Sequence, residues 1–139
     1  MFNVAKPSRR SILVMLAIGL AGCADIGVEP PKPAVEAFLI FFPFDSADID
    51  QAAQQNISVA VAKVPSVKPT RIQVSGYADI TGGTGYNRAL AERRARAVAG
   101  RLIDAGVSAA LINMTAVGEE AIVRDRSAER RVEILLIRD

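Results

Sequence analysis

The sequence predicts one two-layer α/β (α+β) sandwich, with about four strands in a single mixed sheet and two main helices packed on it. Three observations lead to this fold class. The chain has 139 residues, which is room for about one domain. Half of the residues are hydrophobic and 23% are charged, a balance that supports a packed core. Beyond residue 36, strand-like segments alternate with segments typical of helices.

Four segments are expected to form the strands. Residues 37–42 are a dense apolar run with aromatic side chains, and Pro43 ends it. Residues 71–77 alternate between apolar or small and polar side chains, which is typical of a half-exposed strand. Residues 112–117 form the third predicted strand. Residues 131–137 form the fourth, which contains neither proline nor glycine.

Two helices are expected between these strands. Asp48 is placed to cap the first helix, and Pro65 and Pro69 bound its end. The second helix is longer and covers residues 86–105, which are rich in alanine, arginine and leucine. Gly106 follows it directly and is typical of a helix end.

The first 22 residues have the composition of a secretory signal peptide. A basic start precedes an apolar run over residues 12–21, which is too short to span a bilayer. Removing this segment takes away three of the 17 basic residues and no acidic residue. The net charge of +2 therefore describes only the precursor, and the mature chain lacks the basic excess that a nucleic-acid partner requires.

The only cysteine of the chain stands directly behind the apolar run. The segment Leu20-Ala21-Gly22-Cys23 resembles the bacterial lipobox, in which the signal is cut before the cysteine and the thiol carries lipid. We therefore expect lipidation of Cys23 by several acyl chains, palmitate among them. Ala24 follows in place of the aspartate associated with retention at the inner membrane, so the outer membrane is expected.

The domain organisation follows from these segments. Residues 1–22 are the expected signal peptide, residues 23–36 a lipidated N-terminus with a Pro-rich tether, and residues 37–139 the folded domain. The tether holds three of the seven prolines, which favours extended, polyproline-like backbone. We expect the tether to let the domain stand off the membrane.

One arginine of the second predicted helix lies on its apolar face. Arg94 is four residues from both Leu90 and Val98, so it shares their side of the helix. Burying an unpaired guanidinium is costly, so Arg94 needs an acidic partner or a place at the edge of a pocket. A structural ion pair, a side chain reaching the rim and a ligand-binding role all satisfy this requirement.

Asp79 is the natural counterpart of this arginine. It follows the second predicted strand and opens a glycine-rich loop over residues 79–85. In open α/β sheets, ligands commonly bind just beyond the carboxyl ends of strands. Together, Asp79 and Arg94 offer an acceptor for an ammonium group and a clamp for a carboxylate, as an amino-acid-like ligand requires. A plain Asp79–Arg94 salt bridge explains the same residues equally well.

Four motifs in the same order resemble the C-terminal-domain family of OmpA, which includes peptidoglycan-associated lipoproteins. The resemblance covers the chain from about Leu39 to its C-terminus. It is carried by Phe44-Asp45-Ser46, by Gly76-Tyr77-Ala78-Asp79-Ile80-Thr81-Gly82, by Tyr86-Asn87 with Leu90 and Arg93-Arg94-Ala95, and by Arg130-Arg131-Val132-Glu133-Ile134.

This resemblance implies an OmpA-like domain with a noncovalent site for the diaminopimelate residue of the peptidoglycan stem peptide. By the family pattern, Asp79 accepts the ammonium group of diaminopimelate and Arg94 binds its carboxylate. The pocket is also expected to include Asp45, Thr81, Asn87 and Arg131. The whole protein is then expected to be an outer-membrane lipoprotein, with its domain in the periplasm, that tethers the outer membrane to the cell wall.

Three departures from the family pattern leave an alternative open. Tyr77-Ala78 stands where the family usually has His-Thr or His-Ala, and Glu129 replaces an asparagine. The connection from Gly118 to Arg130 is shorter than usual. These changes favour an envelope protein-interaction module, for instance a partner of the Tol type, with weak or lost binding of peptidoglycan.

An enzymatic function is the least favoured hypothesis. The chain has no histidine and one cysteine, which removes the commonest general base, the commonest metal ligand and any internal disulfide. No spacing pairs the acidic residues Asp45, Asp79, Glu119 and Glu120 as a general acid and base. We therefore expect no catalysis, no metal and no cofactor.

Overall fold

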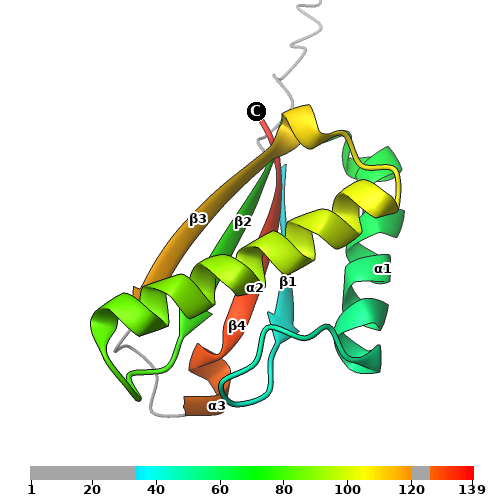
Figure 1. Cartoon of the computed structure of the whole chain (residues 1–139). Coiled ribbons are helices and arrows are strands. Elements are labelled where there is room, and N and C mark those ends of the chain that lie inside the picture. Colours follow the sequence, from blue (N-terminus) through cyan, green and yellow to red (C-terminus); the bar gives the residue numbers. More distant parts are fainter. Residues whose placement is uncertain (1–33, 120–125) are drawn as a thin grey trace, which may run out of the picture.

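The computed structural model describes residues 34–119 and 126–139 of the chain (Figure 1). The predictions for the signal peptide, for Cys23 and for most of the tether lie outside these residues. In chain order, the elements are β1 (Ala34–Phe41), α1 (Gln51–Val67), β2 (Arg71–Ala78), α2 (Thr84–Asp104), a 3-10 turn η1 (Ala109–Leu111), β3 (Ile112–Glu119), α3 (Arg126–Glu129) and β4 (Arg131–Arg138).

The four strands form one mixed sheet in the order β1-β4-β2-β3. β4 is antiparallel to both β1 and β2, whereas β2 and β3 are parallel. The predicted two-layer fold is confirmed, because α1 and α2 pack with the strands around one common core (Figure 1). In the described ranges, no helix combines the length and the apolar character needed to cross a membrane.

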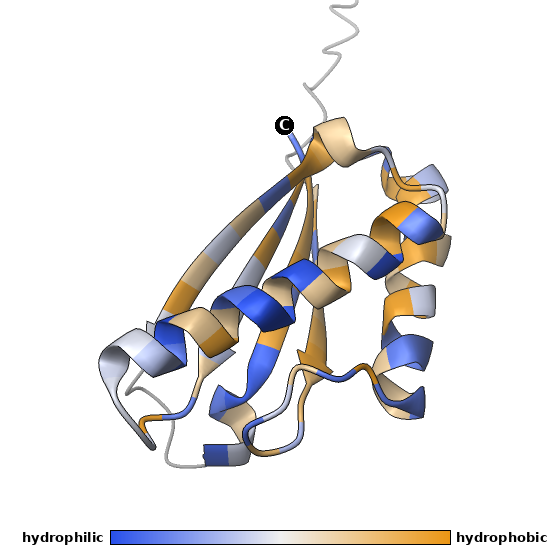
Figure 2. Ribbon diagram, in the orientation of Figure 1, coloured by the Kyte–Doolittle hydropathy of each residue, from blue (hydrophilic) through white to orange (hydrophobic). Residues whose placement is uncertain are grey.

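The core lies between the sheet and the two helices. Along β4, Val132, Ile134 and Leu136 are fully buried, and the residues between them are partly exposed. In Figure 2, hydrophilic and hydrophobic residues alternate along the first half of β2. Each fully buried Ile or Leu side chain contributes on the order of 1.5–3 kcal/mol relative to an exposed one, so this face of the sheet holds the helices in place.

A glycine lets α2 lie directly against β2. A Cβ atom at Gly76 would lie only 2.1 Å from the carbonyl oxygen of Ala91, so no other residue fits without a shift of the helix. This close approach places the first turns of α2 next to the carboxyl end of β2.

The first strand starts earlier than predicted. β1 begins at Ala34, inside the segment 23–36 that the sequence assigned to the tether. Residues 34–36 are in the strand because they pair with the last residues of β4, from Leu136 to Arg138. The pairing partner is distant in sequence, so local composition did not reveal it.

The first helix also differs from the prediction at both ends. Asp50, not Asp48, caps it, and its side chain accepts a 2.7 Å hydrogen bond from the Ala53 N–H. Pro65 lies inside the helix, which continues to Val67 and ends at Lys68 in the left-handed conformation. A proline in the last turn removes one hydrogen bond without preventing the two further helical residues.

Candidate functional site

A cavity of about 190 Å³ opens where the carboxyl end of β2 meets the start of α2. Three segments contribute to it: the turn after β1, the loop after β2 and the first turns of α2. Its lining residues are Phe44, Asp45, Asp79, Thr81, Gly82, Tyr86, Asn87, Leu90 and Arg94. The structure thus brings together five of the six residues predicted for the site, and Arg131 is the exception.

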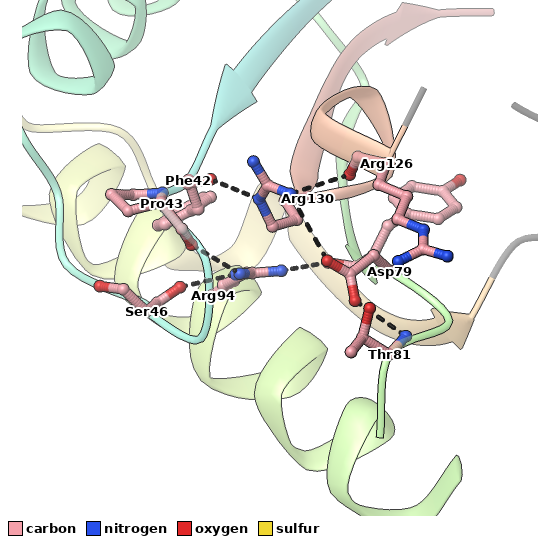
Figure 3. A network of polar contacts seen from close by, with 9 residues as sticks. Phe42, Pro43, Ser46, Asp79, Thr81, Arg94, Arg126 and Arg130 are labelled. Atoms are coloured by element: carbon pink, nitrogen blue, oxygen red, sulfur yellow. Dashed lines mark hydrogen bonds and ion pairs between the residues drawn. The ribbon is translucent and has the colours of Figure 1, made fainter. Parts of the chain in front are cut away.

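Arg94 is fully buried and connects the three segments (Figure 3). Its Nε donates a 2.7 Å hydrogen bond to the carbonyl of Ser46, and its Nη2 donates one of 3.1 Å to the carbonyl of Pro43. Its Nη1 donates to the carbonyl of Tyr77 at 3.0 Å. Arg94 lies on the apolar face of its helix as predicted, and of the alternatives left open for it the structure has a place at the cavity, where backbone carbonyls accept hydrogen bonds from its guanidinium.

The charge of Arg94 is retained in this buried position. Burial lowers the pKa of Arg94 from its ordinary value to about 10, while the nearby negative charge of Asp79 acts in the opposite direction. The guanidinium also lies 5.4 Å from the centre of the Phe42 ring, which adds a cation–π contact. Arg94 is therefore a fixed cation in the cavity wall at neutral pH.

Asp79 supplies the opposite charge and is only 6% exposed. Its Oδ1 accepts a 2.9 Å hydrogen bond from the Thr81 N–H, and its Oδ2 lies 3.5 Å from Nη1 of Arg130 (Figure 3). Burial acts to raise the pKa of Asp79, but the hydrogen bonds from Thr81 and the charge of Arg130 outweigh it and lower the pKa below its ordinary 3.8. Asp79 is thus ionised at neutral pH.

Asn87 lies on α2, as Arg94 does, and a hydrogen bond to β3 holds its side chain. It is only 1% exposed, and its Nδ2 donates a 2.8 Å hydrogen bond to Oε1 of Glu119 in β3. This contact fixes the plane of the carboxamide. Gly82 has φ 102° and lies close to Asn87, since a Cβ atom on it would be 3.4 Å from the Asn87 side-chain oxygen.

Asp45 and Tyr86 meet at the rim of the cavity. The Tyr86 hydroxyl donates a hydrogen bond to Asp45, and this bond raises the pKa of Tyr86 above its ordinary 10.0. Asp45 has φ 51°, a left-handed conformation in which aspartate is among the tolerated residues. The bond joins the turn after β1 to the first turn of α2.

The predicted position of Arg131 at the pocket is wrong. Its guanidinium lies on the open face of the sheet, 4.1 Å from the centre of the Tyr77 ring, and its Nε donates to Glu133 at 2.9 Å. Side chains alternate between the two faces of a strand, and Val132 points into the core. Arg131 must therefore point away from the helices, whereas Arg130 reaches Asp79.

The tertiary structure identifies Arg130 as the partner of Asp79. Apolar residues occupy both even and odd positions of the last strand, Leu135 and Ile137 among them, so the sequence pattern alone does not show which arginine faces the helices. In the structure, alternation along β4 places Arg130 on the face of the buried even-numbered residues. The same alternation explains Tyr77, whose ring packs against Arg131 instead of lining the cavity. The departure at Tyr77 therefore leaves the cavity intact.

The other departure is buried near the end of the sheet. Glu129, in α3, is only 3% exposed, and its Oε2 has no hydrogen-bond partner among the described residues. It is not one of the residues that line the cavity. The shorter connection of the chain includes residues 120–125, which lie outside the described ranges.

The chemistry of the cavity suits a ligand with both charges. One wall carries the fixed Arg94 cation, and the carboxylates of Asp79 and Asp45 lie near it. Leu90 and Phe44 add apolar contact. Within the part of the chain that the structure describes, no three His, Cys, Asp or Glu side chains are grouped so that they could hold a metal ion.

Comparisons with known proteins agree with this fold. A family model described as the OmpA family matches residues 41–134. The chain is 35% identical over 121 residues to a peptidoglycan-associated lipoprotein of Pseudomonas aeruginosa, covering 82% of this chain and 71% of that protein. It is 33% identical over 118 residues to an outer membrane protein of Gluconacetobacter diazotrophicus, covering 76% of this chain but only 31% of that longer protein.

A solved structure is similar to the whole domain. The peptidoglycan-associated lipoprotein from Burkholderia pseudomallei superimposes with a TM-score of 0.63 at 27% identity, covering 73% of this chain and 90% of that one. The family match includes all the residues that line the cavity. The chain therefore belongs to the OmpA family.

Proposed function

We propose that this protein is an outer-membrane lipoprotein that binds peptidoglycan noncovalently through diaminopimelate and so tethers the outer membrane to the cell wall. The observation that carries the proposal is the buried Arg94 cation beside the ionised Asp79 in one small cavity. The relatives named peptidoglycan-associated lipoprotein support peptidoglycan as the binding partner.

The free end of diaminopimelate carries one ammonium and one carboxylate group. Asp79 accepts the ammonium through its oxygens, each of which has room for a second hydrogen bond beside its partner in the protein. Arg94 attracts the carboxylate and is held in one orientation by its bonds to three carbonyls. Both groups are oriented before the ligand arrives, which reduces the entropy cost of binding.

Binding without catalysis is sufficient for this role. A domain attached to the membrane next to a repeating polymer has a high effective concentration of ligand, so a weak single contact still produces durable attachment. The membrane side of the tether would be the lipid on Cys23, with more than one acyl chain because a single chain anchors only marginally.

Calorimetry on a soluble form, residues 24–139, tests the ligand. This form keeps every described strand and helix and the whole core, which spans residues 38–136. It is titrated with a diaminopimelate-containing stem peptide and with its lysine-containing counterpart, which lacks the extra carboxylate. We expect selective binding of the diaminopimelate peptide. A folded domain that binds neither peptide would contradict the proposal.

A separate experiment tests the anchor. The full chain and its Cys23→Ser variant are expressed in a Gram-negative host with radiolabelled palmitate, and the membranes are fractionated. Label and outer-membrane location are expected for the full chain and not for the variant. Equal labelling of both proteins would exclude Cys23 as the lipid site.

A second function, contact with an envelope protein, is favoured by the open face of the sheet. Val35, Leu39 and Phe41 alternate along the edge strand β1 and are 58%, 43% and 47% exposed. Clustered apolar residues on an exposed face often mark a protein contact. A photo-crosslinker at Leu39, with Arg96 on the exposed side of α2 as control, should give one dominant protein adduct in cells if this function is present.

A further inference from the structure

Arg130 lies directly behind the carboxylate of Asp79. It is the last residue before β4, and its side chain is 21% exposed. Its Nη1 is 3.5 Å from Oδ2 of Asp79 and 3.3 Å from the carbonyl of Arg126, to which it donates. Its Nε donates to the carbonyl of Phe42 at 3.3 Å (Figure 3). Two backbone contacts therefore hold the guanidinium against Asp79.

We propose that Arg130 is a positioning residue of this site, which holds the Asp79 carboxylate in the orientation from which it accepts the ammonium group of the ligand. The proposal rests on the function proposed above and adds to it a residue that does not line the cavity. It also assigns different roles to the two neighbouring arginines, since Arg131 lies on the opposite face of the sheet.

The geometry around Asp79 supports this role. Thr81 binds Oδ1 from the loop side, and Arg130 contacts Oδ2 from the β4 side. With a partner on each oxygen, the carboxylate cannot rotate freely about its Cβ–Cγ bond. An ionised carboxylate accepts about four hydrogen bonds, so each oxygen keeps a lone pair for the ligand. Without Arg130, only the Thr81 contact would limit the rotation.

Arg130 is also a cation, and its repulsion of the ligand ammonium must be weighed against its support of Asp79. Asp79 lines the cavity and Arg130 does not, so the carboxylate lies between the guanidinium and the ligand space. A ligand ammonium on Asp79 is then closer to the negative charge than to the positive one. Because the Coulomb energy falls with distance, the attraction is larger than the repulsion.

Removing Arg130 should also change the pH at which binding is lost. The charged or titratable groups near Asp79 include Arg94 and Tyr86 of α2, Asp45 of the turn after β1, Glu119 of β3, Arg126 of α3 and Arg130. Only Arg130 forms an ion pair with Asp79 among the described residues. Its contact lowers the pKa of Asp79, whereas burial raises it. Binding needs ionised Asp79, so without Arg130 it should be lost at a higher pH.

Three variants of residues 24–139 separate the contributions of charge and geometry. Arg130→Gln removes both, Arg130→Lys keeps the charge without the planar fork, and Arg131→Gln is the matched control on the other face. Each is titrated by calorimetry with the diaminopimelate stem peptide between about pH 3 and pH 7, over which carboxyl groups titrate. The peptide's own titration is common to all variants and cancels in the comparison.

For Arg130→Gln, we expect an affinity about tenfold lower at neutral pH, which is the size typical of a lost contact to a charged group. We also expect the acid limb of its binding curve, the pH range over which affinity is lost on acidification, to lie at higher pH. Arg130→Lys should restore the acid limb but only part of the affinity. Arg131→Gln should match the wild type in both respects. If Arg130→Gln binds as tightly as the wild type, or more tightly, with an unchanged acid limb, the proposal is overturned.

A measurement without ligand distinguishes this proposal from the proposed function. The Asp79 carboxyl carbon is titrated by NMR in the free protein and in each variant. A higher pKa in Arg130→Gln than in Arg131→Gln supports the inference even if the wild type binds no stem peptide. An unchanged Asp79 titration overturns it. If Arg130→Gln does not fold, Arg130→Lys tests the role through binding instead: it should bind the stem peptide more weakly than Arg131→Gln while its Asp79 pKa stays low, and equal binding by the two variants overturns the proposal.

Discussion

The two faces of the sheet carry two polar clusters of similar composition at the same end of β4. On the helix side, Arg130 contacts Asp79 at 3.5 Å. On the open side, Arg131 contacts Glu133 at 2.9 Å, and the Tyr77 hydroxyl donates to the other Glu133 oxygen at 3.3 Å. The open-side carboxylate has its partners within its own cluster, whereas Asp79 also faces a cavity.

This difference shows how neighbouring residues of one type acquire different roles. Arg130 and Arg131 are adjacent in sequence, but strand alternation places them on opposite faces. The helix side also holds Arg94, a buried cation that donates hydrogen bonds to three carbonyls and lines the cavity. The proposed binding role of the helix side rests on the cavity and on this second cation.

The largest effect is expected from reversing the charge of Arg94. Arg94→Glu removes hydrogen bonds to three carbonyls and buries a carboxylate next to Asp79, so we expect a loss of about 3–5 kcal/mol in unfolding free energy. Urea denaturation measures it. Arg96→Glu, at a residue whose side chain is 68% exposed on the same helix, is the control and should cost far less. Equal stability of the two variants would contradict the structural role of Arg94.

A smaller effect on stability but a large effect on binding is expected at Asp79. Asp79→Asn keeps the shape of the side chain and removes its charge, so affinity for the diaminopimelate peptide should fall at least about tenfold. Glu133→Gln makes the same chemical change on the open face and should leave binding unchanged. Calorimetry on both variants sharpens the comparison, and a similar loss in both would mean that the cavity is not the site.

The smallest effect concerns the dependence of stability on pH. The pKa of Asp79 is lower in the folded protein than its ordinary 3.8, so its contribution to stability is present above that value and is lost as the pH falls through the folded pKa. The unfolding free energy of the wild type should therefore fall more than that of Asp79→Asn between about pH 5 and pH 3. Parallel curves for the two proteins would show that Asp79 does not gain its stability from Thr81 and Arg130.

Much of the fold was predictable because its signals are local. The alternation in residues 71–77 and the apolar run over residues 134–137 of the last strand depend on neighbours in sequence, and both strands were found. Arg94 was identified from its position on the helical wheel, and it is buried. The exact start of β1 was missed because residues 34–36 are ordered by pairing with β4, about a hundred positions later.

The site was predicted in part for the same reason. Asp79, Thr81 and Asn87 lie close together in sequence around one loop, so their meeting needed little tertiary information. The partners of Arg94 are the carbonyls of Pro43, Ser46 and Tyr77, and no side-chain pattern marks a carbonyl as an acceptor. The hydrogen bond between Tyr86 and Asp45 likewise joins residues 41 positions apart.

The sequence by itself determined the period of each strand and helix, and therefore which side chains share a face. It also determined the presence of a buried arginine and of a carboxylate at the end of a strand. The tertiary structure alone decided that Arg130, not Arg131, contacts Asp79, and that Arg94 binds carbonyls of the turn after β1. The physical reason is that the period of a strand or helix, and the face on which each side chain lies, are properties of local backbone geometry. The contact partners of a side chain depend instead on how distant segments of the chain pack together.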